Sequence, residues 1–462
     1  MAKEITSVPV LSPFDGREVG RVPVPSPAEV EAAVAAAAAA FPATRALPTH
    51  RRAAILRGMA QRIDSEREAL ARLLSAEAGK PIRAARAEVD RGAQTFLAAA
   101  SEVDRRAGDI LPLDLNAASE GRLGLVRRFP LGPVLGITPF NFPLNLPAHK
   151  VAPAIAVGAP IVVKPAPQTP LSMLELRRIA VASGWPEEAM PVLCVDNAAA
   201  EALVLDSRLP VVSFTGSVDV GWRIRSLVPK KRTALELGGN AAAIVHEDAD
   251  LADAVARSVA GAFGYAGQTC ISLQRALVHR PVYDRYRDAL VAKAAALVSG
   301  DPSEEATDVG PMISEAAARR AEAWVEEAVA AGARLLCGGV RKGSFLSPTV
   351  LEGTSREMKV ECSEVFAPVV TVSPYDSFEE ALARAGDSRY GLQAGLFTRD
   401  LGRVMKAWEA LDVGGVIVND VPTWRVDRMP YGGVRDSGVG REGPAYAMDE
   451  YTEPRILVLR VP

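Results

Sequence analysis

Cys270 has the setting in this chain that best suits a nucleophile. It ends a polar segment, Gly267 to Thr269, that is typical of a loop, and an apolar run typical of a strand follows it. Cys194, by contrast, lies inside an apolar run that is typical of a buried and inert thiol. The thiolate is the reactive form of cysteine, so an accessible loop favours nucleophilic chemistry, although free cysteine is commonly a small buried hydrophobe. The local pattern alone leaves both interpretations open.

Two other segments offer partners for such a nucleophile. Glu236 lies in an apolar run beside paired glycines, where burial would raise the pKa of its carboxyl group into the range of a general base. The alternative is a solvated glutamate before a turn. Asn141 follows an apolar run that is typical of a strand, and its amide could donate to an oxyanion. A lone asparagine in a turn bounded by prolines is otherwise structural.

These residues would be positioned by parallel sheets. From Gly121 onward, short runs rich in valine and isoleucine are bounded by glycine or proline and alternate with helical stretches, which predicts an α/β fold with two doubly wound, Rossmann-like domains. Ligands bind such sheets at the carboxyl ends of the strands. The first series of expected strands is 133–137, 160–164, 192–194, 211–214 and 241–245. The second is near 275–279, 334–336, 369–372, 395–398 and 415–419.

Helices dominate the first hundred residues in this interpretation. Ser26, Pro27 and Glu29 have the spacing of a capped helix start, and we expect that helix to end near Pro42. Helical periodicity continues over 50–78 and 84–106 and returns over 315–331. The segments 121–129 and 455–461 alternate like isolated strands outside both series, which predicts an edge or oligomer-forming pair.

Composition narrows the class of protein. A chain of 462 residues favours two large domains, and a formal net charge of -3 gives no field that would attract nucleic acid or anionic lipid. The cysteines are too scattered for disulfides or for the C-x-x-C spacing of a metal site. Met1 to Ile5 hold no apolar signal core, and the alanine run Ala32 to Ala40 is too short to span a membrane. We therefore expect a cytoplasmic protein without a metal or a membrane partner.

At this point the sequence resembles the aldehyde dehydrogenase superfamily along nearly its whole length. Each motif is weak alone, but their joint order is highly specific. The matching segments are Pro139 to Pro143, Lys164-Pro165, Phe214 to Ser217, Glu236 to Gly239, Gly267 to Cys270, Glu364 to Pro368 and Pro430 to Gly433.

The resemblance implies a reaction and the roles of three residues. Cys270 would attack an aldehyde, and Asn141 together with a backbone N–H would hold the oxyanion of the resulting thiohemiacetal. Oxidation would give a thioester, and Glu236 would activate the water that hydrolyses it to a free acid. A glutamate at position 236 argues against the coenzyme-A-acylating branch of the superfamily, which we keep as an alternative.

The resemblance also implies a site for NAD or NADP that does not use the G-x-G-x-x-G motif. Ser217 and a helix N-terminus would hold the pyrophosphate, Lys164 the adenosine ribose and Glu364 the nicotinamide ribose. Pro167 stands where NAD-preferring members often have a glutamate, so NADP becomes admissible. The implied cofactor-binding residues are Ile137, Thr138, Pro139, Phe140, Lys164, Pro167, Gly216, Ser217, Gly221, Leu237, Gly238, Glu364 and Phe366.

The resemblance also places cationic groups near the substrate, which suggests a small anionic or polar aldehyde. The segment from Asn419 to Tyr431 is similar to members of the family that act on phosphonoacetaldehyde, lactaldehyde or succinate semialdehyde. Arg425 is the preferred anion contact because its planar fork suits a carboxylate or phosphonate, the alternative being a salt bridge with Asp427 or Asp420. His149 is otherwise a satisfied helix histidine. Thr269 departs from phosphate-specific relatives, which carry arginine there. The full set of expected substrate contacts is Arg91, Phe142, His149, Thr269 and Arg425.

Domain boundaries follow from the same patterns and resemblance. We expect a cofactor-binding domain over 1–117 and 133–240, a catalytic domain over 241–424, a return to the cofactor domain over 425–444, and oligomerisation strands over 118–132 and 445–462. A homodimer or homotetramer is then expected. Two other classes remain as alternatives: a cysteine hydrolase in which His149 activates Cys270, and a non-catalytic protein that keeps the fold.

Overall fold

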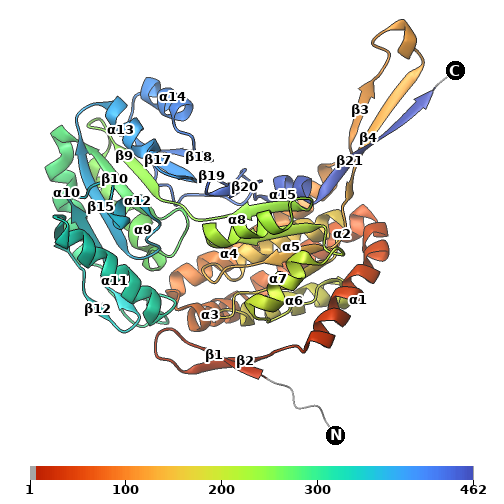
Figure 1. The fold of residues 1–462 in the computed structure, drawn as a ribbon, viewed down its shortest axis with the longest axis horizontal. Helices are drawn as coiled ribbons and strands as arrows, with labels where there is room; N and C mark the ends of the chain where they lie inside the picture. Colours follow the sequence, from red (N-terminus) through yellow and green to blue (C-terminus); the bar gives the residue numbers. More distant parts are fainter. Residues whose placement is uncertain (1–6, 461–462) are drawn as a thin grey trace.

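The protein was studied as a computed structural model that describes residues 7–460. Figure 1 shows two α/β lobes side by side and a long arm of strands that projects away from one of them. The stretch from Met1 to Ile5, where we found no signal core, lies outside the described residues. No single described helix is long and apolar enough to cross a membrane. The helices α1 (Pro27–Ala46) and α2 (Thr49–Ser65) meet the length and composition criteria only when taken together, and they are bent by 115° relative to each other.

The first lobe is built on a sheet that, within residues 7–460, has five strands in the order β20-β8-β7-β5-β6. All neighbours are parallel except β20 and β8. The strands are β5 (Val134–Ile137), β6 (Ile161–Lys164), β7 (Val211–Thr215), β8 (Arg232–Glu236) and β20 (Gly438–Val439).

Helices cover both faces of this sheet, as its apolar strands require. Successive strand residues point to opposite faces, so Val134 and Val211 pack with the α2 to α6 side while Leu135 and Val212 pack with α1, α7 and α8. The helices are α1 (Pro27–Ala46), α2 (Thr49–Ser65), α3 (Arg67–Ala78), α4 (Ile82–Arg105), α5 (Asn145–Val157), α6 (Leu171–Ala182), α7 (Asn197–Leu205) and α8 (Val218–Leu227).

The second lobe has a sheet with the order β11-β14-β15-β10-β9-β17-β18, seven strands in the described part of the chain. Only the β11 and β14 pair is antiparallel. The strands are β9 (Ala241–Val245), β10 (Leu273–His279), β11 (Arg334–Cys337), β14 (Thr349–Glu352), β15 (Val369–Tyr375), β17 (Gln393–Phe397) and β18 (Gly415–Val418). Its helices are α9 (Leu251–Phe263), α10 (Arg280–Ala295), α11 (Glu315–Ala330), α12 (Lys359–Cys362), α13 (Phe378–Gly386) and α14 (Leu401–Ala410).

The connection between the lobes brings the carboxyl edge of the first sheet next to the amino edge of the second sheet. The chain leaves the carboxyl end of β8 at Glu236 and enters the amino end of β9 at Ala241. A Cβ on Gly239 in this connection would lie 2.3 Å from the carbonyl oxygen of Cys270, which itself precedes β10. The carboxyl edge of the first sheet therefore faces the amino edge of the second, and a ligand between them contacts both lobes.

The expected edge pair forms the arm. β4 (Arg122–Pro130) pairs antiparallel with β21 (Thr452–Arg460) along its whole length, and β3 (Asp109–Pro112) adds to β4. α15 (Pro444–Glu450) leads into it. Much of the arm is apolar and exposed: Ile110, Leu111, Ile456, Leu457, Val458 and Leu459 are each at least 39% accessible.

Several expectations about elements were wrong. The segment 192–194 forms only an isolated bridge from Val192 to Val163, and 241–245 is β9 of the second sheet rather than a strand of the first. The strands β8 and β14 were not expected. The first helix passes Pro42 and ends at Ala46, because buried Thr44 anchors its last turn, with its hydroxyl 3.0 Å from the Gly158 carbonyl.

Other expectations were confirmed. The Ser26 and Glu29 side chains form the predicted capping box, and the expected helices over 50–78, 84–106 and 315–331 correspond to α2 with α3, α4 and α11. The mainly helical start is preceded by an unforeseen hairpin, β1 (Ser7–Leu11) and β2 (Glu18–Pro23), which turns at Pro13 to Gly16. Short strand pairs complete the fold: β12 (Arg341–Lys342) with β13 (Phe345–Leu346), and β16 (Tyr390–Gly391) with β19 (Val434–Arg435).

Candidate active site

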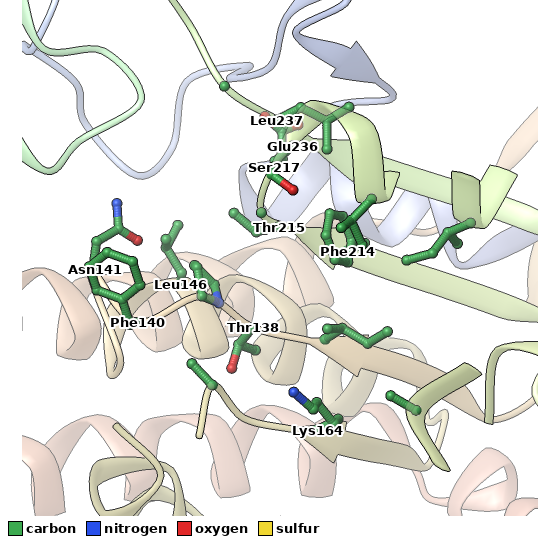
Figure 2. A pocket seen from close by; sticks show the side chains of 18 of the residues that line it. Thr138, Phe140, Asn141, Leu146, Lys164, Phe214, Thr215, Ser217, Glu236 and Leu237 are labelled. Atoms are coloured by element: carbon green, nitrogen blue, oxygen red, sulfur yellow. The ribbon is translucent and has the colours of Figure 1, made fainter. Parts of the chain in front are cut away.

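A cavity of about 610 Å³ lies at the carboxyl edge of the first sheet, where the strand order reverses between β5 and β7. Open α/β sheets bind ligands at this kind of position. Cys270, Glu236 and Asn141 all line the cavity. Figure 2 shows its wall with Asn141 and Phe140 after β5, Lys164 at the end of β6, and Thr215 and Glu236 at the ends of β7 and β8.

An unusual backbone holds the loop that carries Cys270. Tyr265 and Ala266 adopt left-handed φ angles of 50° and 52°, and Gly267 follows at 67°. A Cβ on Gly267 would lie 2.1 Å from the Ala367 carbonyl oxygen, so the close approach requires glycine. Left-handed residues other than glycine cost about 1–3 kcal/mol each and persist where packing enforces them, as at active sites. Both Tyr265 and Ala266 are buried.

Gln268 and Asn141 fix the same loop to its surroundings. The Gln268 side chain is buried, and its Oε1 accepts a hydrogen bond from the Ile313 N–H at 2.8 Å. Asn141 Nδ2 donates to the Gln268 carbonyl oxygen at 3.0 Å. An amide nitrogen carries two hydrogens, so the second N–H of Asn141 is available for another acceptor in the cavity. Asn141 is thus held beside Cys270 by the loop itself.

The Cys270 thiol is half-buried in the cavity wall rather than on an open loop. Its Sγ lies 2.9 Å from the hydroxyl of Tyr431. Burial raises the pKa of Cys270 to about 12, and the Tyr431 hydrogen bond opposes that rise. The resting form is therefore the protonated thiol. Cys194, expected to be buried, is also half-buried, and desolvation raises its pKa to about 11.

Glu236 is buried, as expected for a residue of raised pKa, and is 5% accessible. Burial, followed by the nearby Glu442 carboxylate, raises the pKa of Glu236 well above its ordinary value, against the opposing effect of Lys150. Its Oε2 has no hydrogen-bond partner among the described residues. The alternative of a solvated surface glutamate is thereby excluded.

Lys150 and Glu442 complete a buried charged group that sequence inspection missed. Lys150 Nζ donates to Thr215 Oγ1 at 2.7 Å and lies 3.8 Å from Glu442 Oε1. Burial acts to raise the pKa of Glu442, but His149, Lys150 and Arg425 outweigh it and the net pKa is lowered. Glu442 therefore carries the negative charge while Glu236 retains a proton more readily. A lysine inside the apolar run of α5 was the only sequence signal for this group.

The expected cofactor residues lie together. All of them except Gly221 line the cavity. Gly221, on the first turn of α8, packs closely against Leu237, which lines the cavity. A Cβ on Gly221 would lie 2.3 Å from Leu237 Cδ2. Ser217 is the N-cap residue of α8 and its side chain makes no capping hydrogen bond. The helix therefore presents uncapped N–H groups toward the cavity, as a pyrophosphate site requires.

Glu364 and Phe366 form the wall opposite α8. The Gly239 N–H donates to Glu364 Oε1 at 3.0 Å, and burial raises the pKa of Glu364 to about 7. A Cβ on Gly238 would lie 2.4 Å from Glu364 Oε2, so a side chain at this position would have to displace the Glu364 carboxylate. Phe366 meets Phe140 edge to face at a centroid distance of 5.9 Å. The donors, the glycine clearance and the aromatic wall fit a dinucleotide.

The expected substrate residues gather behind Cys270 rather than in the lining of the cavity. Asp427 Oδ1 lies 2.8 Å from both Arg91 Nη2 and His149 Nε2. The Arg425 side chain is 6% accessible, and its guanidinium lies 3.8 Å from Asp427 Oδ1 and 3.5 Å from Glu442 Oε2. Its guanidinium carbon is 3.7 Å from the Tyr431 ring centroid. The Asp427 contact was the alternative we considered for Arg425, whereas Asp420 pairs with Arg257 instead.

Phe142 and Thr269 flank the same region. Phe142 packs edge to face on Tyr265, and Lys80 Nζ lies 3.8 Å above its ring. Thr269 is half-buried next to Cys270, and its N–H bonds the Gly267 carbonyl at 2.9 Å. Both residues thus border the nucleophile loop.

Comparison with known proteins agrees with this geometry. Residues 1–457 match the Aldehyde dehydrogenase family. The chain belongs to the aldehyde dehydrogenase family. It is 42% identical over 454 residues to aspartate-semialdehyde dehydrogenase 1 of Pseudomonas canavaninivorans, covering 98% of this chain and 97% of the relative. A 3-sulfolactaldehyde dehydrogenase of Priestia aryabhattai is 45% identical over 86% of this chain and 83% of its own length.

Solved structures give the same result. Aldehyde dehydrogenase 21 of Physcomitrella patens, in complex with the reaction product succinate, has a TM-score of 0.97 and 43% identity, covering 100% of this chain and 96% of that one. A glyceraldehyde-3-phosphate dehydrogenase of Methanocaldococcus jannaschii with NADP has a TM-score of 0.94 and 38% identity, covering 98% of both chains. The chain is therefore an NAD(P)-dependent aldehyde dehydrogenase with the predicted fold, and neither the cysteine hydrolase nor the non-catalytic alternative is favoured.

Proposed function

We propose that this aldehyde dehydrogenase oxidises a small aldehyde bearing an anionic group to the free acid, through a thioester on Cys270. The observation that carries the proposal is the stack behind the nucleophile: the buried Arg425 guanidinium lies 3.7 Å from the Tyr431 ring centroid, and the Tyr431 hydroxyl lies 2.9 Å from Cys270 Sγ. Only the Tyr431 side chain thus separates the positive charge of Arg425 from the reacting sulfur of Cys270.

In the proposed first step, the Cys270 thiol releases its proton to water in the cavity, and the sulfur forms a bond to the aldehyde carbon while the carbonyl oxygen becomes an oxyanion. The second N–H of Asn141 and the backbone N–H of Cys270 donate to the oxyanion, a kind of stabilisation that acts most strongly in a site from which water is excluded. NAD or NADP, when bound between α8 and Glu364, supplies the hydride acceptor. The thiohemiacetal on Cys270 then becomes a thioester.

In the proposed second step, Glu236 takes the proton of the water that hydrolyses the thioester. Its raised pKa suits a general base, because a base with a pKa near the working pH combines ionisation with proton affinity. Buried Lys150 interacts electrostatically with both Glu442 and Glu236, and it stabilises the ionised form of Glu236 by Coulomb attraction. A free carboxylate leaves and the Cys270 thiol returns, so the coenzyme-A-acylating alternative is not favoured.

The substrate class rests on charge and on relatives. The relatives act on aspartate semialdehyde and 3-sulfolactaldehyde by their names, and one structural neighbour holds succinate. These molecules are small and carry a carboxylate or a sulfonate. Arg425, with Arg91 on the other side of Asp427, offers the planar donor fork that such groups match. We propose that the anion of the substrate competes with Asp427 for these arginines.

The test compares an anionic and a neutral aldehyde of equal chain length, succinate semialdehyde and butanal, in wild type and in Arg425→Ala. Losing charge-assisted hydrogen bonds worth about 1.5–3 kcal/mol should lower kcat/KM for the anionic aldehyde about 10- to 100-fold more than for the neutral one. Exposed Arg428 provides a matched control, and Arg428→Ala should leave the ratio unchanged. Equal losses with both aldehydes would refute the anion contact, and no turnover of any aldehyde would refute the proposal as a whole.

The remaining assignments are proposals with separate support. We propose the boundaries 1–117 with 133–240 and 425–444 for the cofactor-binding domain, 241–424 for the catalytic domain, and 118–132 with 445–462 for the oligomerisation strands. The two sheets and the pairing of β4 with β21 support these boundaries, but β3, which falls within 1–117, belongs to the arm. The exposed apolar arm supports a homodimer or homotetramer. We also propose a cytoplasmic location.

The cofactor choice rests on Pro167, which is exposed at the rim of the cavity beside Lys164. Pro167 presents no carboxylate that would repel a 2′-phosphate, so we propose that NADP is accepted as well as NAD.

A further inference from the structure

The second sheet has a carboxyl edge of its own, which the proposed reaction does not use. The active-site cavity lies at the amino end of that sheet, because Cys270 precedes β10. At the opposite edge, His246 and Glu247 directly follow β9, and His279 ends β10. These parallel strands are neighbours, so all three side chains meet at the kind of edge where open α/β sheets bind ligands.

The three side chains form a compact donor set. One donor atom from each of His246, Glu247 and His279 lies within 4.8 Å of the others. The imidazole rings of His246 and His279 are 4.4 Å apart at their centroids, and their planes are tilted by 30° to each other. His279 Nδ1 lies 3.7 Å from Glu247 Oε2. Small rotations of these side chains would bring the three donors around a common point.

One of the three donor atoms has no hydrogen-bond partner among the described residues. His279 Nδ1 is buried and has no hydrogen-bond partner among residues 7–460. An unsatisfied buried polar atom costs free energy, so such positions call for a missing ligand or a functional explanation. His246 Nδ1 accepts the Glu247 N–H at 2.9 Å, and an incoming cation would replace that N–H as its partner.

The surrounding charges are compatible with a cation. Asp248 Oδ1 lies 3.4 Å from His246 Nδ1 and adds a second carboxylate. Arg403 is the opposing cation, and it lies 3.4 Å from Asp248 Oδ2. Tyr375 stacks on His279 at 5.2 Å and limits the movement of that ring.

We propose that His246, Glu247 and His279 bind a divalent metal ion of the class that prefers imidazole and carboxylate, such as Zn²⁺, Co²⁺ or Ni²⁺. Two imidazoles and one carboxylate exclude the hard cations, which prefer oxygen alone. The ion would tie the ends of β9 and β10 together on the side of the sheet opposite the nucleophile. Its role is structural, since no residue of the proposed reaction belongs to the set.

The experiment titrates the full-length enzyme with Co²⁺ and follows visible absorption and binding stoichiometry. We expect one Co²⁺ per chain without the thiolate charge-transfer band that binding at a cysteine would produce. Glu247→Gln changes an exposed side chain and should weaken Co²⁺ binding at least about tenfold. His279→Ala should abolish it. His50, an exposed histidine elsewhere, gives the matched control, and His50→Ala should bind Co²⁺ normally.

Aldehyde oxidation separates this site from the active site. Glu247→Gln should retain wild-type kcat and KM with and without Co²⁺, and Co²⁺ should raise the Tm of the wild type but not of this variant. Absence of Co²⁺ binding, a thiolate band, or unchanged affinity in both Glu247→Gln and His279→Ala would overturn the proposal. Normal activity alongside any of these results would leave the proposed oxidation intact.

Discussion

Glu236→Gln tests the hydrolysis step with the smallest change in shape. The amide has the size of the carboxyl group. Glu236 is buried and its Oε2 has no hydrogen-bond partner among the described residues, so the substitution breaks no hydrogen bond of that atom. The substitution removes the proton acceptor and leaves Cys270 and Asn141 in place. General base catalysis contributes about 10²- to 10⁴-fold, so the steady-state rate should fall by that factor.

The formation of the thioester should survive in the same variant. Rapid mixing with saturating aldehyde and cofactor should show a fast burst of one reduced cofactor per active site, followed by a slow steady state. Glu326 is exposed and offers a control, and Glu326→Gln should turn over like wild type without a burst followed by stalling. Unchanged steady-state turnover in Glu236→Gln, or loss of the burst in a folded protein, would refute the assignment of Glu236 to hydrolysis.

Three further predictions address the surroundings of the nucleophile. Tyr431→Phe removes the hydrogen bond that lowers the pKa of the Cys270 thiol, so alkylation by iodoacetamide at neutral pH should slow about 2- to 12-fold, the range of one net hydrogen bond; faster alkylation would contradict this. Gly238→Ala places a Cβ against the flexible end of Glu364, so the protein should fold while the KM for the cofactor rises about tenfold; an unchanged KM would count against that contact. Because the pKa of Glu236 is raised and hydrolysis requires its ionised form, kcat should increase with pH through that raised pKa, and the same dependence persisting in Glu236→Gln would argue against it.

Most of the fold could be predicted from the sequence because local patterns of apolar residues mark its strands and helices. Runs such as 134–137 and 161–164 are continuously apolar, as strands buried on both faces must be. β8 escaped notice because Arg232 and Thr233 interrupt such a run, although the strand pairs on both sides. The segment 192–194 looks like a strand, yet it follows Pro191 and makes a single bridge. Whether such a segment forms a strand depends on the strands beside it in the sheet, and the local sequence pattern does not identify those neighbours.

The candidate site divides in the same way. Cys270 and Asn141 lie in loops marked by glycine or proline, and Glu236 ends β8 just before paired glycines, so their positions could be predicted. The structure brings all three into one cavity. The group formed by Lys150 and Glu442 could not, because its contacts join residues almost three hundred positions apart and neither has a local motif. Contacts of this kind are properties of the packed fold.

The covalent intermediate is the central claim, and mass spectrometry tests it most directly. Glu236→Gln enzyme is mixed with succinate semialdehyde and cofactor, quenched in acid once reduced cofactor has formed, and digested. We predict that the peptide containing Cys270 carries the mass of the acyl group, in an amount equal to the reduced cofactor of the burst, and that Cys270→Ser forms neither product. Reduced cofactor in stoichiometric amount with an unmodified Cys270 peptide would contradict the proposed mechanism.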